Sequence, residues 1–205
     1  MTSHSADNTY LRSSELLSRH ASKLLIVDVQ EKLTPAIPNV GRMISNCRRL
    51  IEGAKILNVP VFATEQYPKG LGATVPELAA LLTDRPAKVR FSCAECLGWG
   101  FADEQTDDRH QVVVAGMEAH VCVLQTVLDL LAHGYRVFVP ADAVASRNDF
   151  DWDVALQRMS SCGATITTTE SVLFEWCEVA GTPEFKQISQ LVKEAGARPS
   201  TDKQT

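Results

Sequence analysis

Cys122 stands where a buried strand is expected to pass into a helix. The apolar run at 112–116 is typical of a buried strand, and apolar residues at helical spacing follow from 123 to 131. A helix N-terminus carries unsatisfied N–H groups and about half a positive charge, which favours a thiolate over a thiol. The same N–H groups can hold an oxyanion when the sulfur attacks a carbonyl carbon. The position predicts a nucleophile with a lowered pKa, and the alternative is an ordinary buried core cysteine.

Two charged residues stand at the ends of other expected strands. Asp28 lies near the carboxyl end of the apolar run at 23–29, where a carboxylate is costly unless it is paired or functional. Lys88 lies in the expected strand at 87–91. An ammonium can stabilise the Cys122 thiolate, and a carboxylate can take the thiol proton and return it to a leaving amine. The alternatives are an Asp28 that caps a turn and a solvated Lys88 on an edge strand.

Four further polar residues near these strand ends are candidates for substrate binding. Glu65 and Tyr67 lie in the loop at 64–72, and a loop at the carboxyl end of a strand commonly contacts substrate. His120 is expected to line the pocket and not to form a Cys–His dyad, because residues two apart on a helix do not face each other. Gln30, two residues after Asp28, completes this set. The alternative for the loop is a plain surface turn.

The cysteine spacing predicts neither a disulfide framework nor a metal site. The six cysteines lie at 47, 93, 96, 122, 162 and 177. Cys93 and Cys96 form a CxxC pair, which is compatible with redox chemistry or half of a zinc site. No second CxxC and no paired histidine motif complete it, so we expect no metal and no cofactor.

The elements that must position these residues alternate between strands and helices. The apolar patterns predict strands at 23–29, 60–64, 87–91, 112–116, 135–140 and 164–168. They predict helices at 40–57, 75–82, 119–133, 149–161, 171–179 and 183–195, while 94–105 reads as a broken helix. This alternation predicts an α/β protein, a three-layer α/β/α Rossmann-like fold with a six-stranded parallel sheet. In such sheets the site lies beyond the carboxyl ends of the strands, near the point where strand order reverses.

Length and composition limit the classes of partner. The chain of 205 residues is 45% hydrophobic, which suits one domain at 21–195 between an N-terminal segment, 1–20, and a polar tail, 196–205. A net charge of -5 with scattered basic residues predicts no nucleic-acid partner. No apolar run approaches the roughly 20 residues of a membrane span, so no membrane partner is expected. The first twenty residues lack an apolar signal region, which predicts a cytoplasmic protein with free thiols.

Five ordered blocks of the sequence resemble the isochorismatase-like cysteine hydrolases. They are LLIVDVQEKL, VFATEQYPKGLGATVPEL, KVRFSC, VAGMEAHVCVLQTVLDLL and VPADAVASRNDFDWDVALQRMSSCGATITTTE. The resemblance extends from about residue 23 to residue 194. It is greatest to the isochorismatase domain-containing proteins, a subgroup that includes sequences labelled as ribonuclease-like.

The resemblance implies a set of catalytic residues. The catalytic triad of the family maps onto Asp28, Lys88 and Cys122. The family also implies a cis peptide bond between Met117 and Glu118 and an oxyanion hole made by the backbone N–H groups of Glu118 and Cys122. Homo-oligomers, dimers or larger, are common in the family. The nicotinamidase branch holds a metal in a histidine-containing loop after the second strand, but this chain has TEQYPKGLG there, so a catalytic metal is not expected.

These observations favour a hydrolase that cleaves a small amide, or a related C–N bond, through an acyl-enzyme on Cys122. A second hypothesis is an interaction or structural protein that keeps the fold without turning over a substrate. The third is a ribonuclease-like activity, against which the acidic net charge and the absence of a basic run both count.

Overall fold

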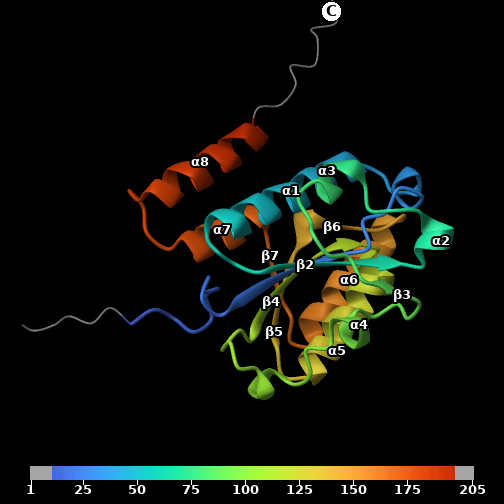
Figure 1. The fold of residues 1–205 in the computed structure, drawn as a ribbon, viewed down its shortest axis with the longest axis horizontal. Helices are drawn as coiled ribbons and strands as arrows, with labels where there is room; N and C mark the ends of the chain where they lie inside the picture. The colour runs from blue at the N-terminus through green and yellow to red at the C-terminus, as the bar shows by residue number, and fades with distance from the viewer. Residues whose placement is uncertain (1–10, 197–205) are drawn as a thin grey trace, which may run out of the picture.

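The computed structural model describes residues 11–196, with side chains for residues 11–193, and shows a central sheet between two layers of helices (Figure 1). Residues 1–10 and 197–205 of the expected terminal segments lie outside the described residues. Leu17, within the expected N-terminal segment, is fully buried and packs in the core on one face of the sheet. Among residues 11–196, no helix combines the length and the apolar composition that crossing a bilayer requires.

The sheet is parallel throughout. Its strands are β1 Ser22–Val27, β2 Val61–Gln66, β3 Ala87–Lys88, β4 Gln111–Met117, β5 Arg136–Pro140, β6 Val144–Ala145 and β7 Thr165–Thr167. The strand order is β3-β2-β1-β4-β5-β7, and β6 pairs with the end of β4. The order reverses between β1 and β4, which is where a site is expected. The predicted three-layer α/β/α fold is confirmed, with one strand more than the six predicted, because a two-residue strand is too short to leave an apolar pattern.

Helices cover both faces of the sheet. They are α1 Val40–Ile56, α2 Pro68–Leu71, α3 Pro76–Ala79, α4 Ala94–Leu97, α5 Leu124–Ala132, α6 Asp149–Ser161, α7 Thr169–Cys177 and α8 Pro183–Gly196. Short turns of other helix types are η1 Thr34–Ala36, η2 Ala102–Glu104, η3 Ala119–Val123 and η4 Ala141–Ala143. Figure 1 shows α1, α3, α7 and α8 on one face and α4, α5 and α6 on the other, and each group encloses its own apolar core.

The strand β1 shows why the central strands are apolar along their whole length. Leu24 and Ile26 pack in the core beneath α1 and α7, whereas Leu25 and Val27 pack in the core beneath α5 and α6. Successive side chains of a strand point to opposite faces, so a strand covered on both faces needs apolar residues at every position. The carboxyl end of β1 is therefore a place where a charged residue must find a partner.

One local prediction differs from the structure, and another is confirmed. The predicted strand at 87–91 is wrong beyond Lys88, because the carbonyl groups of Arg90 and Phe91 bind the Lys88 ammonium instead of a strand partner. The segment 94–105 is a broken helix as expected, divided into α4 and η2. Gly98 and Gly100 separate the two pieces, and both have positive φ angles, 62° and 67°.

Candidate active site

The carboxyl ends of β1, β2 and β3 bring together a buried ion pair. Lys88 Nζ lies 2.7 Å from Asp28 Oδ2, and the two side chains are 3% and 0% exposed. Thr64 Oγ1, near the end of β2, donates a hydrogen bond of 2.8 Å to Asp28 Oδ1. Each carboxylate oxygen of Asp28 therefore has its own donor, which is the condition under which a buried charge is tolerated.

The Lys88 ammonium is surrounded by oxygen atoms. Besides Asp28, it donates to Gln66 Oε1 at 2.7 Å and to the carbonyl oxygens of Phe91 at 2.8 Å and Arg90 at 3.2 Å. An ammonium has three N–H groups, so four neighbouring oxygens leave none of them unused. These contacts fix the position of Lys88 and hold the loop after β3 against the sheet edge.

The backbone at the end of β1 has an unusual φ angle and a close approach to β4. Asp28 has a φ of 51°, in the left-handed region that non-glycine residues seldom adopt. Beside it, a Cβ added to Gly116 of β4 would lie 2.1 Å from the carbonyl oxygen of Val27. Any side chain at this position would force β1 and β4 apart at their carboxyl ends. The close approach therefore requires glycine next to the residue that carries the carboxylate.

Cys122 lies beside this pair, in the π-helical turn η3 that joins β4 to α5. The residue is 5% exposed, and the Asp28 carboxylate lies close enough to affect the pKa of its thiol. Burial raises the pKa of the Cys122 thiol, the charge of Asp28 raises it further, and Lys88 opposes both effects. The predicted lowering of this pKa is wrong, because Lys88 is already paired with Asp28 and the thiol is desolvated. The resting arrangement is a neutral thiol facing a carboxylate that can accept its proton.

The turn before Cys122 has two further features. The peptide bond between Met117 and Glu118 is cis. Glu118 is buried and precedes η3, and its carbonyl oxygen accepts hydrogen bonds from the backbone N–H groups of Val121 and Val123. The chain thus reverses tightly between β4 and the cysteine.

The CxxC pair lies next to the site. Cys93 is fully buried, and its Sγ is 3.2 Å from Thr64 Oγ1, the hydroxyl that also binds Asp28. Its backbone N–H donates to Thr126 Oγ1, which donates in turn to the carbonyl oxygen of Cys122 at 2.7 Å. Cys93 and Thr126 therefore join the loop after β3 to the helix that carries Cys122.

Neither cysteine of the pair is placed as a metal ligand. Burial, and then the charge of Asp28, raise the pKa of Cys93 to about 12, and the Cys96 thiol binds the Cys93 carbonyl oxygen at 3.2 Å. Within residues 11–193, no group of three or more His, Cys, Asp or Glu side chains is arranged to hold a metal ion. Both thiols lie near the ion pair of Asp28 and Lys88.

The sequence patterns do not identify four of the residues around the ion pair, namely Thr64, Gln66, Cys93 and Thr126. The available signal was that Thr64 and Gln66 are polar residues at the end of the strand that pairs with β1. Thr126 carries no such signal, because its role depends on the packing of α5 against a loop far away in the sequence.

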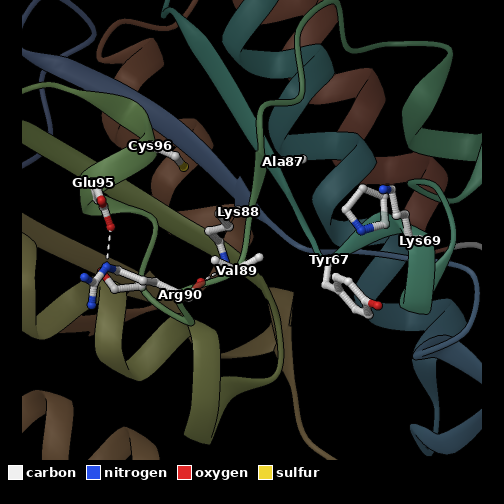
Figure 2. Close-up of a pocket in the computed structure, with 10 residues that line it drawn as sticks. Tyr67, Lys69, Ala87, Lys88, Val89, Arg90, Glu95 and Cys96 are labelled. Carbon is white, nitrogen blue, oxygen red and sulfur yellow. Dashed lines mark hydrogen bonds and ion pairs between the residues drawn. The ribbon is translucent and has the colours of Figure 1, made fainter.

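Tyr67 and Lys88 line a cavity of about 750 Å³ at this edge of the sheet. Figure 2 shows Tyr67 and Lys69 on one side of the cavity and Lys88, Val89 and Arg90 on the other. Cys96 and the ion pair between Arg90 and Glu95 border it as well. Of the four residues expected to bind substrate, Tyr67 is the one at this cavity, and it is 53% exposed.

Gln30 and Glu65 have structural roles. Gln30 is fully buried, and its amide binds the backbone N–H and C=O of Gln66 and the carbonyl oxygen of Gly72. The Glu65 carboxylate accepts two hydrogen bonds of 2.8 Å from Thr74, one from its backbone and one from its hydroxyl. Neither residue lines the cavity beside Lys88. Both residues hold the loop after β2 through these hydrogen bonds.

His120 contacts the segment after β6. Its Nδ1 lies 2.9 Å from Ser146 Oγ, and its Nε2 lies 3.9 Å from Asp151 Oδ2. The residue is partly exposed and is not among those lining the cavity beside Lys88. Through Ser146, His120 joins the cysteine turn to the segment after β6.

Residues 22–171 match the isochorismatase domain family. The chain is 41% identical over 187 residues to isochorismatase domain-containing protein 2 of Danio rerio, covering 91% of this chain and 92% of the relative. It is 41% identical over 180 residues to the secreted isochorismatase effector Isc1 of Phytophthora sojae (strain P6497), covering 85% and 86%.

The structure is also similar to that of MAR1 ribonuclease from Caenorhabditis elegans. The TM-score is 0.79 at 36% identity, over 91% of this chain and 99% of the other. The resemblance found in the sequence is thus confirmed at the level of the domain and of the hydrolase fold. The chain belongs to the isochorismatase family.

Proposed function

We propose that this protein is a cysteine hydrolase that cleaves a small-molecule amide, or a related C–N bond, through an acyl-enzyme on Cys122. The observation that carries the proposal is the thiol of Cys122 beside the buried Asp28 carboxylate, whose charge is balanced by Lys88. A base beside a thiol is one arrangement that activates a cysteine for nucleophilic catalysis.

In the acylation step, the Cys122 sulfur attacks the carbonyl carbon while Asp28 takes the thiol proton. The carbonyl oxygen becomes an oxyanion, held by the backbone N–H groups of Glu118 and Cys122. The C–N bond then breaks, Asp28 returns the proton to the leaving nitrogen, and the acyl group remains as a thioester on Cys122.

Deacylation uses the same groups in reverse. Asp28 takes a proton from a water molecule that attacks the thioester carbonyl carbon. The second oxyanion accepts hydrogen bonds from the same backbone N–H groups. The C–S bond breaks, the Cys122 sulfur recovers a proton from Asp28, and a carboxylic acid leaves. Lys88 stabilises the ionised form of Asp28 in both half-reactions, since it stays fixed by Gln66 and the carbonyl oxygens after β3.

The cavity beside Lys88, whose lining residues do not include Asp28 or Cys122, has a size that suits a small substrate. Its volume of about 750 Å³ falls in the usual range for small-molecule sites, roughly 300–1,000 Å³. Tyr67 and Val89 offer apolar surface, while Lys69 and Ser92 offer polar groups. This mixture suits an amide joined to an apolar body.

A screen of amides, ureas and hydroxamates tests the proposal, with mass spectrometry of the intact protein to find an acyl adduct on Cys122. Cys122→Ala should form no adduct and show no turnover. Cys162→Ala is the matched control, because Cys162 is exposed at the end of α6 and should be dispensable. An adduct on Cys93, or turnover that survives in Cys122→Ala, contradicts the nucleophile assignment.

The mechanism as proposed uses no metal and no cofactor. Dialysis against a chelator should leave turnover unchanged, since each step is carried by side chains and backbone N–H groups. Activity that is lost on dialysis and restored by zinc would overturn this part of the proposal.

We also propose that the protein forms homo-oligomers, dimers or larger, and acts in the cytoplasm. Tyr67, Val89 and Phe91 expose 53%, 78% and 50% of their surface close to the cavity, which suits a contact with a second copy. All six cysteines are free thiols, as expected in a reducing compartment. Light scattering measures the oligomeric state, and fractionation of cells that make the protein shows its location.

A ribonuclease-like activity is the second candidate, favoured by the similarity to MAR1 ribonuclease. The net charge of -5 counts against it, because RNA binding depends on basic residues that neutralise phosphates. Incubation with a labelled single-stranded RNA decides between the candidates. Cleavage that is lost in Cys122→Ala would favour this candidate, and intact RNA beside amide turnover would favour ours.

The third candidate is a protein that keeps the fold and binds a partner without turnover. The complete set of hydrogen bonds around Asp28 and Lys88 favours catalysis over this candidate, since a buried charge pair is costly to retain. A wild-type protein that forms no acyl adduct with any amide or activated ester would support it.

A further inference from the structure

The strand β6 runs beside the last residues of β4, immediately before the cysteine turn. In the parallel register Gly116 pairs with Val144, and Met117 pairs with Ala145. These are the residues directly upstream of Glu118. The backbone of β6 thus fixes the point at which the cysteine turn leaves the sheet.

Beyond the last paired residues of β4 and β6, side chains connect the two segments. Glu118 Oε2 accepts one hydrogen bond from Arg147 Nε at 3.0 Å and another from the Arg147 backbone N–H at 3.1 Å. The Glu118 side chain is 6% exposed and that of Arg147 is 58% exposed. Arg147 therefore holds a nearly buried carboxylate from the solvent side.

A second contact lies two residues further along the chain, at His120. The hydroxyl of Ser146, which is buried, lies 2.9 Å from His120 Nδ1. The residues 144–147 thus touch the chain at 116, 117, 118 and 120 in succession. None of the hydrogen bonds of Asp28 and Lys88 described above involves this segment.

We propose that Arg147 and Ser146 are positioning residues that hold the turn from Glu118 to Cys122 so that its backbone N–H groups face the developing oxyanion. The inference rests on the proposed function. The bonds from Val121 and Val123 to the Glu118 carbonyl close the turn internally, but they do not fix its orientation against the sheet. Arg147 and Ser146 supply that orientation through Glu118 and His120.

Two reactions at the same sulfur separate this role from a general effect on the thiol. Acylation of Cys122 by p-nitrophenyl acetate passes through a tetrahedral oxyanion, and it is followed by nitrophenolate release and by the mass of the adduct. Alkylation by iodoacetamide is a direct displacement at carbon that forms no oxyanion. A displaced oxyanion hole should slow the first reaction and leave the second unchanged.

The expected losses are graded. Arg147→Ala should slow acylation about tenfold, less than the roughly 10²–10³ for complete loss of a donor, because the backbone bond from residue 147 remains. Glu118→Ala removes both bonds and should slow acylation more. Arg147→Lys and Glu118→Gln each keep a partner and should recover most of the rate, and Ser146→Ala should cost about threefold.

Arg48→Ala is the matched control, because Arg48 makes an ion pair of 3.0 Å with Glu52 on the surface of α1, away from the turn. It should leave both reactions at the wild-type rates. Thermal unfolding of each variant checks that the fold is intact.

The outcomes separate this inference from the proposed function. If acylation and alkylation fall together in Arg147→Ala, or neither falls, the positioning role is wrong while the nucleophile assignment stands. If wild-type protein is acylated elsewhere than at Cys122, the proposed function fails and the inference fails with it.

Discussion

Two lysines are buried in this sheet, one at each end of the strands. Lys88 lies at the carboxyl end, 2.7 Å from the fully buried carboxylate of Asp28. Lys23 lies at the amino end of β1, where it donates to Gln105 Oε1 at 2.9 Å and pairs at 3.5 Å with Asp107, whose side chain is 47% exposed. Its ammonium also lies 5.1 Å from the centre of the Trp99 ring.

The comparison shows that a buried lysine does not by itself identify a site. Lys23 joins a surface loop to the sheet, and its carboxylate partner is hydrated. Lys88 is paired with a fully buried carboxylate that lies beside the thiol of Cys122. What distinguishes the carboxyl end is the buried carboxylate of Asp28 with the thiol of Cys122 next to it.

The largest difference should appear when each carboxylate is removed. Asp28→Asn should reduce acylation of Cys122 by about 10²–10⁴-fold, since a general base contributes that much, and Cys122→Ala should abolish it. The double variant should be little worse than Cys122→Ala, because members of a catalytic unit act together. Asp107→Asn should keep the wild-type rate. Nitrophenolate release measures all four, and strictly multiplicative losses would mean that Asp28 and Cys122 act independently.

Removing each lysine should separate stability from activity. Lys88→Met leaves the Asp28 charge buried without its partner, which should lower the free energy of unfolding by about 3–5 kcal/mol and stop acylation. Lys23→Met leaves no buried charge behind and should cost about 1–2 kcal/mol with the rate unchanged. Urea unfolding measures the difference. Equal losses of stability in the two variants would show that enclosure of the anion is unimportant.

The hydroxyl of Thr64 should matter less than either charge. Thr64→Val keeps the shape but removes the donor to Asp28 Oδ1, so it should slow acylation about tenfold and cost about 1 kcal/mol of stability. Thr64→Ser should recover most of the rate, because it restores the donor. If Thr64→Val acylates at the wild-type rate, the Lys88 contact alone positions Asp28.

The smallest effect concerns the pH dependence of alkylation at the two thiols. Because the pKa of Cys122 is raised, its thiolate becomes abundant only in alkaline solution, and its reaction with iodoacetamide should still be accelerating above pH 9. At pH 7 the exposed Cys162 should be labelled before Cys122. Mass spectrometry of tryptic peptides follows both residues. Faster labelling of Cys122 at pH 6 would mean that its pKa is lowered, as the sequence had predicted.

Much of the fold follows from the sequence, because the apolar runs that become β1, β4 and β5 are buried on both faces and have no polar alternation to confuse their assignment. Asp28 was identifiable for the same reason, since a carboxylate in such a run must have a partner. Lys88 and Cys122 follow from their places near the ends of the expected strands. Gln30 and Glu65 were less predictable, because a polar residue after a strand can face either a cavity or the backbone of its own loop.

The sequence by itself determined the order of the elements, the family and the three residue types that meet at one edge of the sheet. Only the tertiary structure decided how those residues affect one another. The pKa of Cys122 depends on desolvation and on whether Lys88 is already paired with Asp28, and both are properties of packing.

The contacts that hold the turn from Glu118 to Cys122 were also decided only by the tertiary structure. The two-residue strand β6 and the contacts of Arg147 and Ser146 join segments about thirty residues apart, and no local pattern encodes them. Local propensity and apolar periodicity act within an element, whereas a hydrogen bond between distant elements exists only when the whole sheet is assembled.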